Sequence, residues 1–136
     1  MDLHPRTPED LPEVTRLLEA EGLAAEGLDL TRGWVVRVQG RVVGHVAVEL
    51  TADAAVLRSL VVDPAHRGSG MAGRLLEVAE AAAGRRALVL KTETIGPWIL
   101  RRGYVPATRE QVPSSVLATT QFQGALCACC PIYLKA

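Results

Sequence analysis

One stretch, residues 57–83, limits the fold of this chain more than any other, because it joins an apolar strand to a helix through a glycine-rich loop. Leu57–Val62 is apolar and rich in β-branched residues, which predicts a buried strand. Met71–Ala83 carries apolar residues at helical spacing, which predicts an amphipathic helix. The loop at residues 67–70 reads Arg-Gly-Ser-Gly. We therefore expect a strand–loop–helix unit in the middle of the chain.

Such a unit is suited to binding an anion. The first turn of a helix has backbone N–H groups without partners, and the helix dipole adds partial positive charge there. Gly68 and Gly70 have no Cβ, so an anion can approach the backbone closely. Arg67 adds a full charge and a planar fork of donors. The sequence therefore predicts a phosphate-binding site.

Length and composition restrict the class of protein. With 136 residues, 49% of them hydrophobic, the chain is expected to form one domain, residues 1–136, with a substantial core. The absence of a long apolar run and of a signal peptide predicts a cytoplasmic protein that does not enter a membrane. A formal net charge of zero argues against a nucleic-acid partner. Three closely spaced cysteines, Cys127, Cys129 and Cys130, do not indicate a disulfide framework.

The rest of the chain supplies further strands around this unit. Trp34–Val38 and Val42–Leu50 are joined by a tight turn and so form an antiparallel hairpin, which Ala54–Val62 continues. Ala87–Lys91 follows the long helix and is expected to run parallel to Leu57–Val62 through a right-handed crossover. Further strands are expected at Met1–Arg6, from Tyr104, and at Leu126–Leu134, and further helices at residues 8–21, Ala24–Leu30, Pro97–Arg102 and Pro113–Thr119. The predicted fold class is α+β, similar to an α/β sandwich, with a mixed sheet of about six or seven strands flanked by helices.

Two known phosphate-binding motifs fit the loop poorly. Residues 68–73 match G-x-G-x-x-G, and Glu93 lies about 20 residues further on, as in dinucleotide-binding domains. That motif places its first glycine directly after the strand, whereas residues 63–67 intervene here and hairpins precede the strand. The P-loop motif is absent because the sequence has no G-K-[ST]. Both alternatives are therefore disfavoured.

A third motif accounts for more residues. Residues 62–72 contain V-x-P followed by R-x-x-G-x-A. The chain also has D-L-P-x-V-x-x-L-L at Asp10–Leu18, G-x-V-V-G at Gly40–Gly44 and R-x-G-Y at Arg101–Tyr104. In this order the chain resembles the GCN5-related N-acetyltransferase (GNAT) superfamily over nearly its whole length. The resemblance implies the GNAT fold and acetyl transfer from acetyl-CoA to a small-molecule amine, with no metal.

A narrower resemblance concerns the acceptor. L-R-S-L-V-V-x-P-x-x-R-G-x-G from Leu57, K-T-E-T from Lys91 and R-x-x-x-P-x-x-V-x-x-T-x-Q-F from Arg109 are similar to arsenic-resistance-linked N-acetyltransferases. Close relatives of that group are often labelled amino-acid N-acetyltransferases. The resemblance implies an acceptor that is an amino acid or an arsenic- or phosphorus-containing analogue. The C-terminal residues 128–131 depart from the pattern of the group, which leaves the substrate open.

The resemblance also implies roles for residues of the central unit. The pyrophosphate of CoA is expected on the backbone of Arg67, Gly68, Ser69, Gly70, Met71 and Ala72. The pantetheine arm is expected along the strand at Leu60, Val61 and Val62. The Leu60 N–H takes a catalytic role in this scheme, because it would donate to the acetyl carbonyl oxygen.

The groups that move protons are less defined. Ile99 stands where a tyrosine commonly protonates the leaving thiolate in this superfamily. Glu49, Glu93 and His45 are candidates for the base. A weak base suffices for an α-amino group, because its pKa of about 7.7–8.0 leaves neutral amine available near neutral pH.

Arg58 is the predicted substrate-binding residue. It lies in an otherwise apolar strand, and a buried charge needs a partner. That partner is either the substrate carboxylate or an internal carboxylate, Glu49 or Glu93. Thr92 and Thr94 are expected to line the same pocket, because ligands bind where neighbouring strands part at their carboxyl ends.

Two other functions are compatible with parts of the sequence. A CoA-binding sensor or interaction module without catalysis is suggested by Ile99 in place of tyrosine. Thiol-based binding of metal or arsenite is suggested by Cys127, Cys129 and Cys130, although strand alternation places Cys130 on the opposite face from the other two. The resemblance to the superfamily also implies a possible homodimer.

Overall fold

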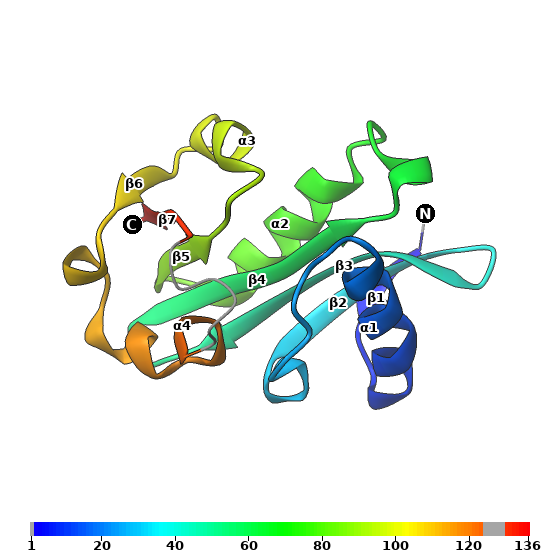
Figure 1. Cartoon of the computed structure of the whole chain (residues 1–136), viewed down its shortest axis with the longest axis horizontal. Helices are drawn as coiled ribbons and strands as arrows, with labels where there is room; N and C mark the ends of the chain where they lie inside the picture. Colours follow the sequence, from blue (N-terminus) through cyan, green and yellow to red (C-terminus); the bar gives the residue numbers. More distant parts are fainter. Residues whose placement is uncertain (1, 124–129) are drawn as a thin grey trace.

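A seven-stranded mixed sheet runs through the computed structural model, which describes residues 2–123 and 130–136 (Figure 1). Across the sheet the order is β1-β2-β3-β4-β5-β7-β6. The strands are β1 Asp2–Pro5, β2 Arg32–Val38, β3 Arg41–Leu50, β4 Ala54–Val62, β5 Ala87–Lys91, β6 Val105–Ala107 and β7 Ile132–Lys135. The helices are α1 Leu11–Ala20, α2 Met71–Ala83, α3 Gly96–Leu100 and α4 Thr120–Gln123. The α+β class and the mixed sheet of about six or seven strands are confirmed.

The chain path places the strand–loop–helix unit at the centre of the sheet. β1 to β4 form an antiparallel meander, and β5 pairs with β4 in parallel. α2 makes the crossover between these two parallel strands, as the sequence predicts. β7 lies between β5 and β6 and is antiparallel to both.

Helices cover both faces of this sheet (Figure 1). α2 packs Met71, Leu75 and Leu76 into the largest apolar cluster, and α1 contributes Val14 and Leu18 to a second cluster on the other face. α4 lies on the face that α1 covers (Figure 1), where its Phe122 belongs to a third cluster. The strands β4 and β5 therefore lie between helices that pack on both faces of the sheet.

The two central strands separate near their carboxyl ends. Parallel pairing of β4 with β5 runs only as far as Leu57 opposite Leu90. Beyond that point β4 pairs only with β3, and its ladder is interrupted between Arg58 and Val61. Within the interruption Ser59 has φ +57°, a left-handed conformation that is uncommon for a residue with a Cβ. The strand therefore contains a β-bulge at the place where the neighbouring strand departs.

One local expectation was wrong, and two others were met only in part. The segment Ala24–Leu30 is not a helix, because Gly27 adopts φ +74° and only one 3₁₀ turn, Leu28–Leu30, follows it. Residues 113–119 form a 3₁₀ segment, Ser114–Ala118, and α4 follows directly although the sequence did not predict it. Of the expected strand Leu126–Leu134, β7 covers Ile132–Leu134 and runs on to Lys135; Cys130 and Pro131 are not in a strand, and residues 126–129 lie outside the described part of the chain.

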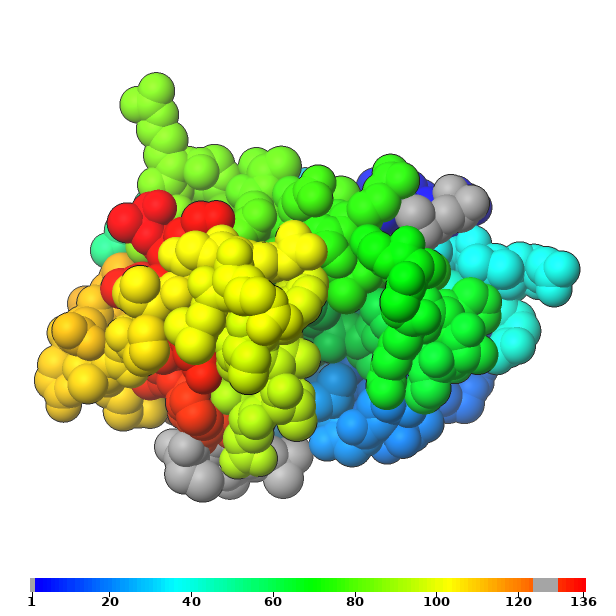
Figure 2. All heavy atoms as spheres, turned by 90° about the horizontal axis from the view of Figure 1, so that it is seen from above, coloured from blue at the N-terminus to red at the C-terminus, as the bar shows by residue number. Residues whose placement is uncertain are grey.

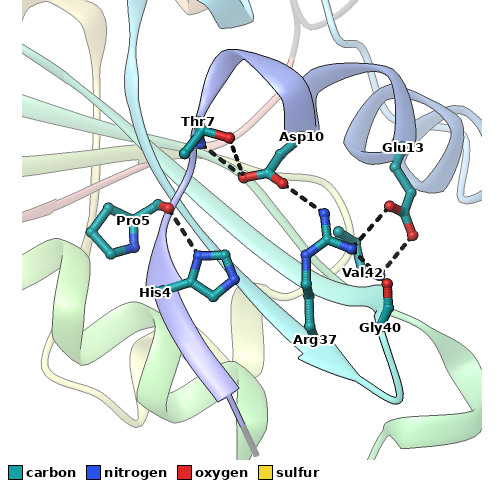
Figure 3. A network of polar contacts seen from close by, with 8 residues as sticks. All are labelled: His4, Pro5, Thr7, Asp10, Glu13, Arg37, Gly40 and Val42. Carbon is teal, nitrogen blue, oxygen red and sulfur yellow. Dashed lines mark hydrogen bonds and ion pairs between the residues drawn. The ribbon is translucent and has the colours of Figure 1, made fainter.

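A polar network ties α1 to the β2–β3 hairpin (Figure 3). The Asp10 carboxylate accepts hydrogen bonds from the Thr7 N–H at 2.8 Å and from the Arg37 guanidinium at 2.6 Å. Glu13 also contacts Arg37, at 3.2 Å, and accepts from the backbone N–H of Val42 at 2.8 Å. Burial of Asp10 acts to raise its pKa, but the bonds from Thr7 and Arg37 outweigh burial and hold the pKa below its ordinary value.

Replacing Asp10 with alanine is expected to lower the free energy of unfolding by about 1.5–3 kcal/mol, because hydrogen bonds to a charged group are lost. Urea melts at pH 7 measure the change, and Glu9→Ala, which removes the same charge from an exposed position one residue away, serves as the control. The Asp10 contribution is present above an ordinary carboxyl pKa of about 3.9 and is lost as the pH falls through the lower folded value. Equal losses for both variants would contradict the assignment.

Candidate active site

A cleft opens where β4 and β5 separate. It has a volume of about 640 Å³ and is lined on the β4 side by Leu60, Val61 and Val62. The opposite wall consists of residues in α3 and on either side of it, namely Thr94, Ile95, Pro97, Trp98 and Arg101. Figure 2 shows the molecule hollowed between the green segment that contains the glycine loop and the yellow segment of α3. Divergence of the strands thus creates an elongated, partly apolar slot beside the exposed edge of β4.

The glycine loop forms a second hollow that continues the first. This hollow has a volume of about 290 Å³ and shares Val62, Arg67, Ala72 and Trp98 with the cleft. Gly68 and Gly70 both have φ +82°, so the backbone requires glycine at these positions. No other atom lies within 4 Å of where their Cβ atoms would be, which leaves the backbone accessible. An anion can therefore reach the start of α2 from the end of the cleft.

Arginine side chains surround this second hollow. The Arg67 guanidinium donates to the Val62 carbonyl at 3.3 Å and pairs with Glu21 at the end of α1. Arg102, which the sequence analysis did not single out, lies 4.3 Å from the Trp98 ring centroid. It also occupies the space beside Gly73, where a Cβ would come within 2.6 Å of its guanidinium. The pair Arg101-Arg102 directly before Gly103 was the signal in the sequence that could have pointed to Arg102.

Arg58 is buried on the opposite side of the sheet from the Leu60 side chain. Its cross-strand partner is Ala47, which packs in the α1 cluster, whereas Leu60 packs against the α2 cluster. Its guanidinium donates to the Thr120 hydroxyl at 2.8 Å, and this hydroxyl donates to Glu49 at 2.7 Å. Arg58 is therefore linked to Glu49 through Thr120 of α4.

A second buried cation, Lys91, was missed by the sequence analysis. It follows Leu90 at the end of β5, and Arg58 follows Leu57; Leu57 and Leu90 are the last residues through which β4 and β5 pair. Its Nζ lies 4.8 Å from the Phe122 ring centroid and has no hydrogen-bond partner among residues 2–123 and 130–136. Burial of an ammonium group is costly without a partner, and the aromatic ring compensates only partly. A lysine at the end of an apolar strand was the available signal.

The candidate bases differ in accessibility. Glu49 accepts from Thr120, and Glu93 is exposed in the loop after β5. His45 was wrong as a candidate, because its ring is fully buried and both nitrogens are engaged. Burial lowers the pKa of His45 to about 4, and the guanidinium groups of Arg6 and Arg58 act in the same direction, although the Ser59 carbonyl and Asp10 oppose them. This imidazole is neutral near pH 7.

The two predicted threonines have different surroundings. The Thr92 hydroxyl accepts from the N–H groups of Thr94 and Ile95, so it shapes the turn before α3. Thr94 is exposed and lines the cleft. The structure therefore brings Thr94 to the cleft and gives Thr92 a supporting position.

Among the described residues that line the cleft there is no tyrosine, so none of them supplies the hydroxyl that is missing at Ile99. Ile99 is fully buried in the core. Tyr104 is buried too, and its hydroxyl donates to Glu80 of α2 at 2.8 Å. Burial and this contact raise the pKa of Tyr104 well above its ordinary value, so it is a poor proton donor.

The open slot beside a bulged strand is continued by a glycine loop at a helix start, an arrangement that can receive an elongated ligand with an anionic group. A family model for the acetyltransferase (GNAT) domain matches residues 29–106, more than half of the chain. The chain therefore belongs to the GNAT acetyltransferase family. A search among curated proteins gives no match.

Solved structures of low sequence identity share this fold. N-acetylglutamate synthase from Neisseria gonorrhoeae, complexed with coenzyme A and N-acetyl-glutamate, superimposes with a TM-score of 0.78 at 20% identity over 99% of this chain. This chain spans only 35% of that synthase. Rv2747 from Mycobacterium tuberculosis, in complex with CoA and NLQ, gives 0.76 at 16% identity and is covered over 98% of both chains. A GNAT-family acetyltransferase from Staphylococcus aureus Mu50 gives 0.73 at 13% identity, over 98% of this chain and 97% of that one.

The described residues contain no group of three or more His, Cys, Asp and Glu side chains placed to hold a metal. Cys130 is buried, and Cys127 and Cys129 lie outside the described part of the chain. Within that same part, no helix has both the length and the apolar character needed to cross a bilayer.

Proposed function

We propose that this protein transfers an acetyl group from acetyl-CoA to the amino group of a small molecule that carries a carboxylate, namely an amino acid or an amino-acid analogue. The observation that carries the proposal is the cleft formed where β4 and β5 part, with the glycine loop at one end. Acetyl-CoA supplies the acetyl group as a thioester. The chain supplies binding groups along one continuous path.

The residues along that path fit this co-substrate. The loop residues Arg67 to Ala72 would receive the pyrophosphate, and the open space at Gly68 and Gly70 supports this assignment. Leu60, Val61 and Val62 line the cleft and are proposed to hold the pantetheine arm through backbone groups. We assign the Leu60 N–H to the acetyl carbonyl oxygen, where it would stabilise developing negative charge.

On the other face, two buried cations support a carboxylate-bearing acceptor. Arg58 and Lys91 each follow the last residue through which β4 and β5 pair with each other, and both contact α4. A substrate carboxylate would offset the cost of burying the Lys91 ammonium. The synthase from Neisseria gonorrhoeae is complexed with N-acetyl-glutamate, which is consistent with an amino-acid acceptor. An arsenic- or phosphorus-containing analogue belongs to the same chemical class.

Proton removal makes only a small demand on the protein if the acceptor is an α-amino group. Glu49, held by Thr120, and the exposed Glu93 are proposed as acceptors for this proton, directly or through water. We also propose Thr94, at the cleft wall, as a substrate contact, with Thr92 supporting its loop.

Thiol release tests the proposal. The full chain is incubated with acetyl-CoA and a panel that contains the common amino acids, a phosphorus-containing and an arsenic-containing analogue, and simple amines without a carboxylate. We expect turnover with at least one amine that carries a carboxylate. Tight acetyl-CoA binding by calorimetry without turnover would favour instead a CoA-binding module, the candidate suggested by Ile99. Absence of binding would exclude both.

Replacing Lys91 with methionine is expected to raise the KM for the carboxylate-bearing acceptor roughly tenfold, equivalent to about 1.4 kcal/mol. The KM for acetyl-CoA should stay the same, and the free energy of unfolding should not fall, because no described hydrogen bond of Nζ is lost. Lys91→Arg keeps the charge and is the matched control. An equal effect on an acceptor without a carboxylate would contradict the role.

A thiol-based function is tested separately. Cys127→Ser/Cys129→Ser with unchanged arsenite affinity would exclude it. A homodimer and a cytoplasmic location are further predictions, which size-exclusion chromatography and fractionation of cells can test.

A further inference from the structure

The bulge in β4 has an unusual internal support. Two residues of β4, Ser59 and Leu60, lie opposite the single residue Val46 of β3. Ser59 is held at φ +57°. A left-handed conformation at a residue with a Cβ persists only where the surroundings enforce it. The contacts of the Ser59 peptide group therefore decide whether the bulge keeps its shape.

His45 provides one of these contacts. Its Nδ1 lies 3.0 Å from the Ser59 carbonyl oxygen, and its Nε2 lies 3.0 Å from Nη1 of Arg6. A carbonyl can only accept and a guanidinium can only donate, so Nδ1 carries the proton and Nε2 accepts. The ring is completely buried, and both of its nitrogens have protein partners. His45 is thus a fixed donor aimed at the bulge.

Arg6 is itself fixed from several directions. Its Nη2 donates to the carbonyl oxygens of Leu28 at 2.9 Å and Thr31 at 2.7 Å. Gly33 leaves room for this arrangement, because a Cβ there would lie 2.5 Å from Arg6 Nη1 and 3.0 Å from His45 Nε2. A series of hydrogen bonds therefore leads from Arg6, at the end of β1, through His45 to the bulge.

The peptide bond between Ser59 and Leu60 links the orientation of the Ser59 carbonyl to that of the Leu60 N–H. The Ser59 carbonyl and the Leu60 N–H belong to one planar peptide unit, and the described chain contains no cis peptide bond. In a trans peptide the C=O and N–H point in opposite directions. Because the carbonyl points toward the His45 ring, the Leu60 N–H points away from that ring, and Leu60 itself lines the cleft.

We propose that Arg6 and His45 form a positioning pair that clamps the Ser59 carbonyl and thereby aims the Leu60 N–H into the cleft. The inference rests on the proposed function in one respect, namely that the Leu60 N–H meets the acetyl carbonyl. Neither Arg6 nor His45 is among the residues that line the cleft, so both would act through the backbone. His45, which has no other role in the proposed acetyl transfer, then orients the peptide group between Ser59 and Leu60.

Two substitutions at one position test the pair. His45→Leu removes both hydrogen bonds, whereas His45→Asn keeps an N–H near the position of Nδ1 and so can still donate to Ser59. We expect His45→Leu to lower kcat by about tenfold or more with the KM for acetyl-CoA within about threefold, and His45→Asn to restore kcat to within about threefold of the native value. A general loss of folded protein would not produce this rescue.

A readout without turnover separates this inference from the proposed function. In isotope-labelled protein, the Leu60 amide resonance should shift in His45→Leu and return toward its native position in His45→Asn. If the native protein acetylates no amine, the proposed function fails, and the amide resonance still decides whether the pair holds the bulge. If His45→Leu does not fold, Gly33→Ala displaces Arg6 instead and should also shift the Leu60 amide. An unchanged Leu60 resonance, or full kcat in a folded variant that lacks the clamp, would overturn the proposal.

Discussion

Replacing Ala72 with glutamate is expected to lower the affinity for acetyl-CoA about 100-fold, equivalent to about 2.7 kcal/mol. Ala72 lies in the first turn of α2 and lines both the cleft and the hollow of the glycine loop. A glutamate there fills the junction between them and sets a negative charge where the diphosphate is expected. The helix start that favours an anion would then be occupied by the protein's own carboxylate.

Isothermal calorimetry with acetyl-CoA measures this loss. Ala81→Glu makes the same substitution at an exposed position of the same helix and should bind with native affinity. Unchanged affinity of Ala72→Glu in a folded protein would contradict the placement of the pyrophosphate. It would leave the assignment of the chain to the family unaffected, because that rests on the whole pattern of residues.

The free energy of unfolding is expected to fall by about 3 kcal/mol between pH 6.5 and pH 4 because of one buried side chain, His45. Burial lowers the pKa of His45 from 6.5 to about 4. Between pH 6.5 and pH 4, His45 is therefore protonated in the unfolded chain but stays neutral in the folded chain, so acid favours unfolding. The contribution is complete above pH 6.5 and is lost as the pH falls toward the folded value.

Urea melts at several pH values between 7 and 4 measure this dependence. His45→Asn has no group that titrates in this range at that position and should lose about 3 kcal/mol less than the native protein. His4→Asn removes a histidine from the edge strand β1 and is the control, which should retain the native pH dependence. The lowered pKa of Asp10 affects stability only at more acidic pH, so the two effects occupy separate ranges. An identical fall for native protein and His45→Asn would refute the assignment.

The fold class and the strand–loop–helix unit could be predicted because they depend on local sequence. Gly68, Gly70 and the apolar stripe of α2 act over a few residues, so strand, loop and helix are all encoded in one segment. The short strands β6 and β7 and the helix α4 carry weaker local signals, because their conformation depends on packing around Phe122 and Ile132.

The acceptor half depended on the tertiary structure. Arg58 and Leu60 would share one face of a regular strand, and only the bulge at Ser59 separates them. Lys91 became a candidate only because the structure shows it buried against Phe122, which lies 31 residues later in the chain.

The sequence alone determined the central strand–loop–helix unit, because backbone conformation at glycines and helical periodicity are local properties, and its motifs carried the resemblance to the GNAT acetyltransferase family. Only the tertiary structure decided that His45 is a neutral buried donor rather than a base, and that it supports the bulge beside the cleft. The physical reason is that burial, pKa and hydrogen-bond partners arise from residues far apart in sequence: Arg6, His45 and Ser59 lie on three different strands or strand ends.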